Sequence, residues 1–198
     1  MIELIFSIIV ISVAVITLPV MTQVTTKGVE SNIVQEAIFA ASAELMGATS
    51  YYWDRRSMED SNTSRLSRVI DVNGNCENNT SSTRYRLRPG HIVQPYHRRC
   101  LDSISTTVDN ASDATFPNLN NAAHSASAIF FNTTPSGSGY KDGYNSAVVI
   151  TNEDEQGNSD NDIKKITVSV TKSDGTPLIQ LNTYSANVGE VDYYKRRF

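Results

Sequence analysis

The sequence is poor in the residues that usually carry catalysis or hold metals: its 198 residues include two cysteines and three histidines. It also lacks the glycine-rich phosphate loops, the nucleophile elbow and the paired-histidine helix that mark common enzyme classes. His91, His97 and Cys100 are close in sequence, but their spacing matches no common zinc motif. We therefore expect a protein that is not an enzyme and has no resident cofactor.

Basic charge is scarce as well, with 17 Lys and Arg against 21 Asp and Glu and a formal net charge of -4. Nucleic-acid-binding domains usually carry a basic patch on a basic domain. We therefore do not expect nucleic acid to be a partner of this chain.

Charge is almost absent from residues 1–22, where Glu3 is the only charged side chain, and the first basic residue is Lys27. About 20 apolar residues in a helix span roughly 30 Å, the hydrocarbon thickness of a bilayer. A cleaved signal peptide would need a basic start and a small-x-small cleavage site, and a buried core helix would be shorter. We expect a retained helix, in which Glu3 needs a partner because a carboxylate at the centre of a membrane helix costs about 2.5–3.5 kcal/mol.

The helical pattern continues beyond Pro19, with apolar residues at spacings of three and four. The predicted buried stripe comprises Val29, Ile33, Val34, Ala37, Ile38, Ala41, Leu45 and Ala48. The predicted solvent face comprises Glu30, Ser31, Gln35 and Glu44. This pattern predicts one helix of about 50 residues that ends near Tyr51–Trp53, with a kink or local melting at Pro19 or Gly28.

The rest of the chain predicts a loop-rich region followed by a sheet. Turn-forming residues dominate 54–125, where the strand candidates are Arg65–Val72 and Thr83–Leu87. Cys76 and Cys100 lie in this region, and two cysteines in an exported, loop-rich segment favour a disulfide. Free thiols in a cytosolic protein are the alternative.

Strand signals strengthen after residue 125. The candidates are Ala126–Phe131, Ala147–Thr151, Lys165–Thr171 and Pro177–Thr183. Ser173-Asp174-Gly175 predicts a hairpin turn between the last two. We expect an α+β fold in which an antiparallel sheet covers the amphipathic half of the helix. Its parts are 1–22 and 23–53, the two halves of the helix, 54–125, a variable region, and 126–198, the sheet and tail.

One acidic loop is a weak candidate for calcium. Residues 152–162 contain Asp154, Asp160 and Asp162 on a flexible, glycine-containing segment, and Ca²⁺ prefers such oxygen ligands. The spacing does not match an EF-hand. The alternative is a solvated turn between two strands.

The N-terminus resembles that of type IV pilins and of the pseudopilins of type II secretion systems. Met1-Ile2-Glu3-Leu4-Ile5-Phe6 looks like the third to eighth positions of the mature family motif, so that Glu3 matches the family's glutamate. Pro19 falls one position short of the family's proline. The family's basic leader, the glycine before the cleavage point and the first two mature residues would lie upstream of Met1. The stretch 164–190 has a weaker resemblance to the last strands of minor pilins.

This resemblance implies a pilin-like, non-enzymatic subunit of a type IV pilus or pseudopilus, of the minor type, in which Glu3 pairs with the N-terminal amine of a neighbouring subunit. The implied partners are other pilin or pseudopilin subunits, the inner-membrane assembly platform, membrane lipid before assembly, and a prepilin peptidase where an upstream leader exists. The implied location is the bacterial inner membrane as a single pass, with the C-terminal domain in the periplasm, and later a filament. The alternative is a single-pass, anchored periplasmic binding module that does not assemble.

Overall fold

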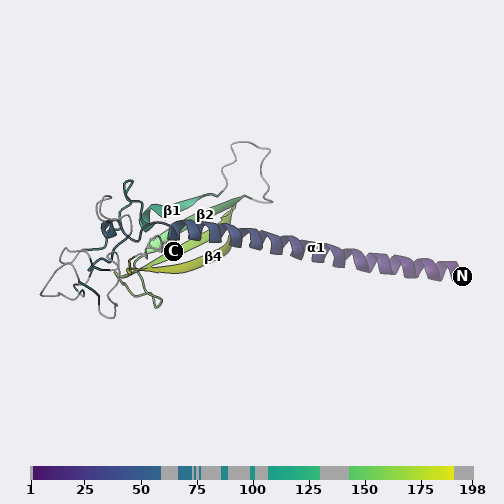
Figure 1. The fold of residues 1–198 in the computed structure, drawn as a ribbon. Coiled ribbons are helices and arrows are strands. Elements are labelled where there is room, and N and C mark those ends of the chain that lie inside the picture. The colour runs from purple at the N-terminus through teal and green to yellow at the C-terminus, as the bar shows by residue number, and fades with distance from the viewer. Residues whose placement is uncertain are drawn as a thin grey trace, which may run out of the picture.

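The computed structural model describes residues 2–58, 67–72, 74, 76, 86–88, 99–100, 107–129 and 143–189. In chain order its elements are α1 (Ile2–Thr49), the 3-10 turns η1 (Arg55–Ser57) and η4 (Leu119–Ala122), and the strands β1 (His124–Ala128), β2 (Tyr144–Thr151), β3 (Ile163–Lys172) and β4 (Pro177–Ala186). The second half of α1 lies against the sheet, and the first half projects away from the rest of the molecule (Figure 1). The predicted α+β layout, with the helix on one face of an antiparallel sheet, is confirmed.

The sheet has four strands in the order β1-β2-β3-β4, and every neighbouring pair is antiparallel. Ile166, Val168 and Val170 alternate along β3 and are completely buried beneath the helix, as the sequence pattern predicts. The predicted hairpin turn joins β3 to β4. Gly175 has a φ of 87°, a left-handed conformation that glycine adopts without strain.

The helix packs on this sheet through small side chains. Ala37, Ala41 and Ala48 are buried in the core, which lets the helix backbone approach the strands closely. Ile33 and Leu45 flank them and are partly buried. These five positions of the predicted stripe therefore lie against the sheet.

Three other members of the predicted stripe do not. Val29, Val34 and Ile38 remain 41%, 38% and 37% exposed. The sheet covers only the arc of the helix centred on the alanines, and these residues lie outside it. The prediction was too wide because periodicity identifies an apolar face and does not show how much of that face one sheet can cover.

Glu44 is a second correction, since we expected it on the solvent face and it is partly buried against β2. The Ser146 hydroxyl donates to Glu44 Oε1 over 3.3 Å, and two turns earlier the Tyr144 hydroxyl donates to Glu36 Oε2 over 2.8 Å. Hydroxyl donors on β2 thus allow two carboxylates to face the sheet. The sequence pattern contains no sign of these donors.

The helix is unbroken at Pro19 and Gly28, so the local melting that we considered at these residues is absent. Figure 1 shows α1 without a sharp bend along its length. The helix ends at Thr49, two residues before the predicted range. The N–H groups of Ser50 and Tyr51 bond back to the carbonyls of Gly47 and Ala48 and close the last turn.

The region after the helix contains less strand than predicted. Within Arg65–Val72, the described residues 67–72 form only one isolated bridge, between Val69 and Cys100. Most of Thr83–Leu87 lies outside the described residues, as does the end of Ala126–Phe131. The predicted disulfide between Cys76 and Cys100 is present, and both cysteines are buried beside Val69.

Asn187, just after β4, holds this region to the sheet. Its Oδ1 accepts the Ile70 N–H over 2.9 Å, and its Nδ2 donates to the Ile70 carbonyl over 2.7 Å and to Asp162 Oδ1 over 2.9 Å. Asp162 in turn pairs with Arg88. One side chain therefore connects three segments that are far apart in the sequence.

Replacing Asn187 with alanine is expected to lower the free energy of unfolding by about 2 kcal/mol, because two buried backbone groups of Ile70 lose their partners. The measurement is urea unfolding of the detergent-solubilised chain, followed by the fluorescence of its single tryptophan, Trp53. Asn182→Ala is the control, since Asn182 is exposed on β4. Equal effects of the two substitutions would contradict the role of Asn187.

Candidate functional site

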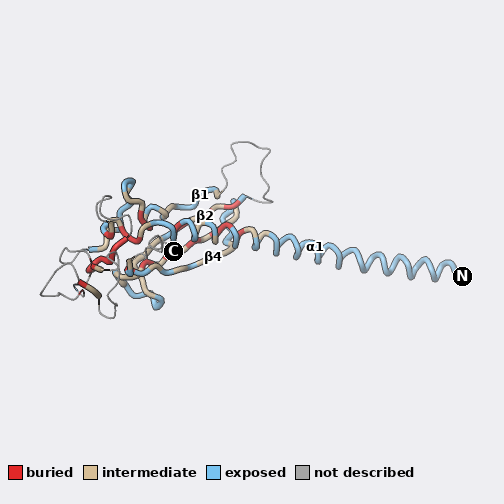
Figure 2. The backbone as a smooth tube through the Cα atoms, viewed as in Figure 1, coloured by how far each residue is buried: buried red, intermediate tan, exposed pale blue. Residues whose placement is uncertain are grey.

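The first half of α1 is the largest uncovered apolar surface of the described chain. Every residue from Ile2 to Val24 is exposed, and this half appears as one continuous pale-blue segment in Figure 2. At 1.5 Å per residue it is about 35 Å long, enough to cross the hydrocarbon of a bilayer. By length and composition α1 could therefore span a membrane.

The hydroxyl groups in this half are satisfied within the helix. Ser7 and Ser12 donate to the carbonyls four residues earlier, over 2.8 and 2.7 Å, and Thr17 and Thr22 donate to carbonyls three residues earlier. Lipid offers no hydrogen-bond partners, so internal satisfaction suits a helix that lies in lipid or against other apolar helices. Glu3 remains the one charged group in this half.

The charged residues of α1 differ in whether the sheet provides them with a hydrogen-bond partner. Its only basic residue is Lys27, and its acids are Glu3, Glu30, Glu36 and Glu44. Glu36 and Glu44 accept hydrogen bonds from the sheet. Glu3 and Lys27 are exposed and make no ion pair within the described part of the chain. The helix therefore presents one exposed acid, Glu3, at the start of its apolar half, and one exposed base and one exposed acid, Lys27 and Glu30, just beyond the end of that half.

The apolar surface also extends onto the half of α1 that carries the domain. Phe39 and Met46 are 73% and 70% exposed. They are seven residues apart, so they lie on the same side of the helix, away from the buried alanines. Two large apolar side chains in this position form a surface suited to another helix.

The acidic loop does not assemble the calcium ligands considered above. Asp154 accepts from the N–H and the amide of Asn158, Asp160 accepts from the N–H of Asp162, and Asp162 pairs with Arg88. The Asn158 side-chain amide, helped by its backbone N–H, lowers the pKa of Asp154. The three carboxylates thus serve three separate contacts, and the described residues contain no group of three metal-ligating side chains.

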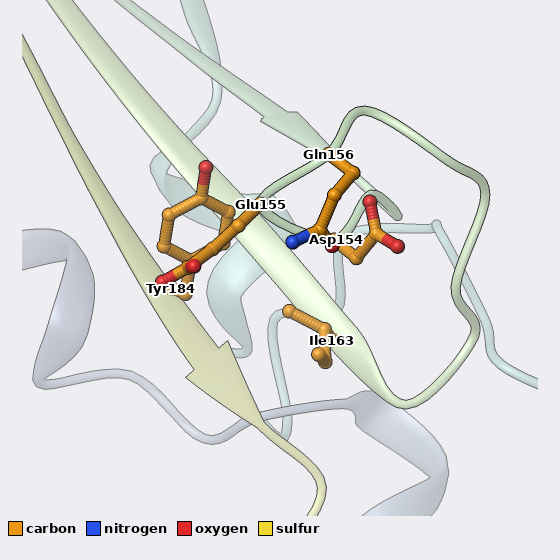
Figure 3. Close-up of a pocket in the computed structure, with 5 residues that line it drawn as sticks. All are labelled: Asp154, Glu155, Gln156, Ile163 and Tyr184. Carbon is orange, nitrogen blue, oxygen red and sulfur yellow. The ribbon is translucent and has the colours of Figure 1, made fainter.

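A shallow cleft of about 290 Å³ lies beside this loop, on the sheet face opposite the helix. It is lined by Asp154, Glu155, Gln156, Ile163 and Tyr184, which Figure 3 draws as sticks. This lining offers negative charge and an aromatic surface but no nucleophile next to a base. It provides no support for catalysis.

The histidine and cysteine group considered for zinc is not supported by the described residues. Cys100 is bonded to Cys76 and has no thiolate to offer a metal. His91 and His97 lie outside the described residues. The third histidine, His124, has its Nδ1 2.9 Å from the Ser125 carbonyl oxygen.

A buried ion pair, which the sequence did not lead us to expect, attaches the segment between α1 and η1 to the sheet. The Lys164 ammonium lies 2.8 Å from Asp54 Oδ2 and 4.8 Å from the centre of a Trp53 ring, and both charged side chains are fully buried. Burial lowers the pKa of Lys164, while the hydrogen bond and charge of Asp54 oppose this shift. The one available signal was register, because Lys164 falls on the same face of β3 as the buried Ile166.

Comparison with family models, with curated proteins and with solved structures finds no match for this chain. The N-terminal residues and the geometry of α1 are therefore the features of this chain that bear on its function.

Proposed function

We propose that this chain is a non-enzymatic structural subunit of a type IV pilus or a type II secretion pseudopilus. The supporting observation is α1, an unbroken 48-residue helix whose second half is docked on the sheet and whose first half has no partner in the described structure. A membrane can cover the first half before assembly, and the helices of neighbouring subunits can cover it in a filament. Such an exchange suits a surface that is apolar on all sides.

Glu3 favours one position along the helix at which a neighbouring subunit can pack against this apolar surface. A carboxylate that leaves water is strongly penalised unless it meets an opposite charge. A subunit that places Glu3 beside a cation is therefore favoured over one that enters the filament in another register. The partners that follow are other pilin-like subunits and the inner-membrane assembly platform, and the location before assembly is the inner membrane with the sheet in the periplasm.

The first test is Glu3→Ala. We expect this variant to reach the membrane normally and to enter filaments at least about tenfold less often, since a tenfold change corresponds to the loss of only ~1.4 kcal/mol. The measurement is the amount of the chain in sheared filaments relative to membranes in the producing cells. Glu30→Ala is the control, because Glu30 is an exposed acid on the same helix but lies beyond its apolar half.

Equal incorporation of Glu3→Ala and the unaltered chain would contradict the assembly role of Glu3. If the unaltered chain stays in the membrane and never enters a filament, the plain anchored periplasmic module becomes the better description.

A further inference from the structure

The last strand, β4, leaves one edge of the sheet unpaired. It forms the margin of the sheet on the side away from β1 (Figure 1). The Asn187 N–H bonds to the Asp162 carbonyl in the same register that pairs β4 with β3. Because backbone groups alternate in direction along a strand, Gln180, Asn182 and Tyr184 point their N–H and C=O groups away from β3. None of these groups forms a hydrogen bond within the described part of the chain.

This edge also lacks the features that usually protect an edge strand from further pairing. Such strands are commonly short, charged or interrupted by bulges. The ten residues of β4 include no charged side chain, and its one proline, Pro177, is the first residue. The shift in its pairing lies between Val170 and Thr171 of β3, opposite the start of β4. Residues 179–186 therefore form a regular edge about 25 Å long that can accept another strand.

The start of this edge lies beside an apolar surface that the sheet leaves uncovered. The hydroxyl of Tyr144, the first residue of β2, donates to Glu36, so this flank of α1 lies over β2. Val34 and Ile38 are two positions before and after Glu36, which places them on the opposite flank, toward β4. Tyr144 pairs with Lys172 at the end of β3, so this level is also the start of β4. A strand added beside β4 can therefore cover the exposed parts of Val34 and Ile38.

The acidic cleft borders the other end of the same edge. Tyr184 lines the cleft and is 39% exposed, and Asp154 and Glu155 contribute carboxylates. No basic residue is among its described lining, and the nearby Lys165 is paired with Glu153. The volume of about 290 Å³ can hold one long side chain. A lysine or arginine in this cleft would meet negative charge and an aromatic ring.

We propose that β4 is a docking site for an extended segment of another protein, which adds to the sheet as a fifth strand. The added strand runs antiparallel to β4, as every neighbouring pair in this sheet does. Its side chains toward the helix are apolar, and its middle is uncharged. A lysine or arginine near its N-terminal end enters the cleft beside Tyr184. This binding goes beyond the proposed filament role and does not depend on it.

A second copy of the chain is a poorer occupant of this edge. Two β4 strands pair antiparallel about a two-fold axis perpendicular to the sheet, and this axis points the two α1 helices in opposite directions. Their projecting halves then cannot enter one membrane from the same side. The other margin of the sheet, β1, has five residues and a register shift between His124 and Ser127. It is too short and too irregular to pair along residues 179–186.

The test is binding of a synthetic peptide of about ten residues to the detergent-solubilised full chain. Valine and threonine alternate in the peptide, one arginine replaces the first threonine, and both ends are blocked. We expect bound peptide to slow amide hydrogen exchange at Gln180, Asn182 and Tyr184. Asn182→Pro, which removes an N–H from the middle of the edge, is expected to weaken binding at least about tenfold. Asn182→Ala is the control and is expected to bind within about twofold of the unaltered chain.

Charge reversal at the cleft supplies a second test that does not involve a proline. Glu155 is exposed, so Glu155→Lys is compatible with the fold. We expect this variant to bind the arginine peptide about tenfold more weakly and a peptide with threonine at that position unchanged. A peptide with glutamate at that position is expected to prefer Glu155→Lys over the unaltered chain.

Equal binding of the peptide to Asn182→Pro and Asn182→Ala overturns the proposal, and so does an absence of binding at millimolar peptide. Indifference of all three peptides to Glu155→Lys overturns the assignment of the cleft to a cation. Dimers of the chain alone with slow exchange at the same amides would identify a second copy as the occupant and overturn the proposal. None of these results bears on filament incorporation, which the Glu3→Ala experiment tests separately.

Discussion

Replacement of Lys164 with methionine is expected to lower the free energy of unfolding by about 3–5 kcal/mol, the cost of removing one partner from a buried ion pair. Asp54 would keep its buried carboxylate without the cation that lies 2.8 Å away. The same carboxylate accepts the N–H of Arg56 at the start of η1 and the N–H of Asp109. These two N–H groups do not supply the positive charge that Lys164 provides.

The adjacent residue of β3 supplies a matched control. Lys165 points to the opposite face of the sheet, where it pairs with Glu153 over 3.3 Å and remains partly exposed. Lys165→Met is expected to change stability by less than about 1 kcal/mol, as for other surface pairs. Urea unfolding followed by Trp53 fluorescence measures both variants. Similar losses at the two neighbouring lysines would mean that burial of the Lys164 pair does not control stability.

A double-mutant cycle isolates the pair itself. Asp54→Asn/Lys164→Met is expected to be less destabilised than the sum of the single variants, by at least about 1 kcal/mol, because neither charge is then left alone. Additive losses would indicate that each side chain stabilises the fold through its other neighbours.

The parts of this fold that the sequence predicted are those with a regular period. Alternation along β3 places Ile166 and Val170 toward the helix, and spacings of three and four place Ala37 and Ala41 toward the sheet. These patterns depend only on residues near one another in the chain. Register alone also points Lys164 inward, but a lysine is buried only where a partner exists, and Asp54 lies 110 residues earlier.

The predictions that were wrong also concern contacts with residues far away in the chain. Glu44 faces β2 because Ser146, 102 residues away, offers a hydroxyl. Val34 and Ile38 remain uncovered because the sheet is narrower than the apolar stripe. The candidate site likewise contains one feature that the sequence predicts and one that it does not. Glu3 stands out in the sequence as an isolated acid. The exposure of Phe39 is visible only once the sheet is placed on the other side of the helix.

Removal of the disulfide by Cys76→Ser/Cys100→Ser is expected to lower the free energy of unfolding by about 3–4 kcal/mol, from the loop-closure entropy of the segment between the cysteines. The bond also lies among buried charges. The Arg68 guanidinium donates to the Cys100 carbonyl over 2.6 Å, and Asp71, which pairs with Arg86, accepts the Cys76 N–H over 3.2 Å. Without the covalent link, the backbone groups that meet these side chains are held only by the charged network itself.

Reduction of the native disulfide removes the same covalent link as the serine variant without changing a residue. Dithiothreitol added to the folded, unaltered chain is expected to reproduce the stability loss of the serine variant, with a similar dependence of stability on urea concentration. Before reduction, thiol labelling of the native protein is expected to modify neither cysteine. A serine variant within about 1 kcal/mol of the unaltered chain would show that the network around Arg68 and Arg86 holds the loop by itself, since loop closure alone predicts a larger loss. The expected loss of 3–4 kcal/mol is of the order of half the total stability of a marginally stable domain, so we expect the part of the chain beyond α1 to depend on oxidation to complete its fold.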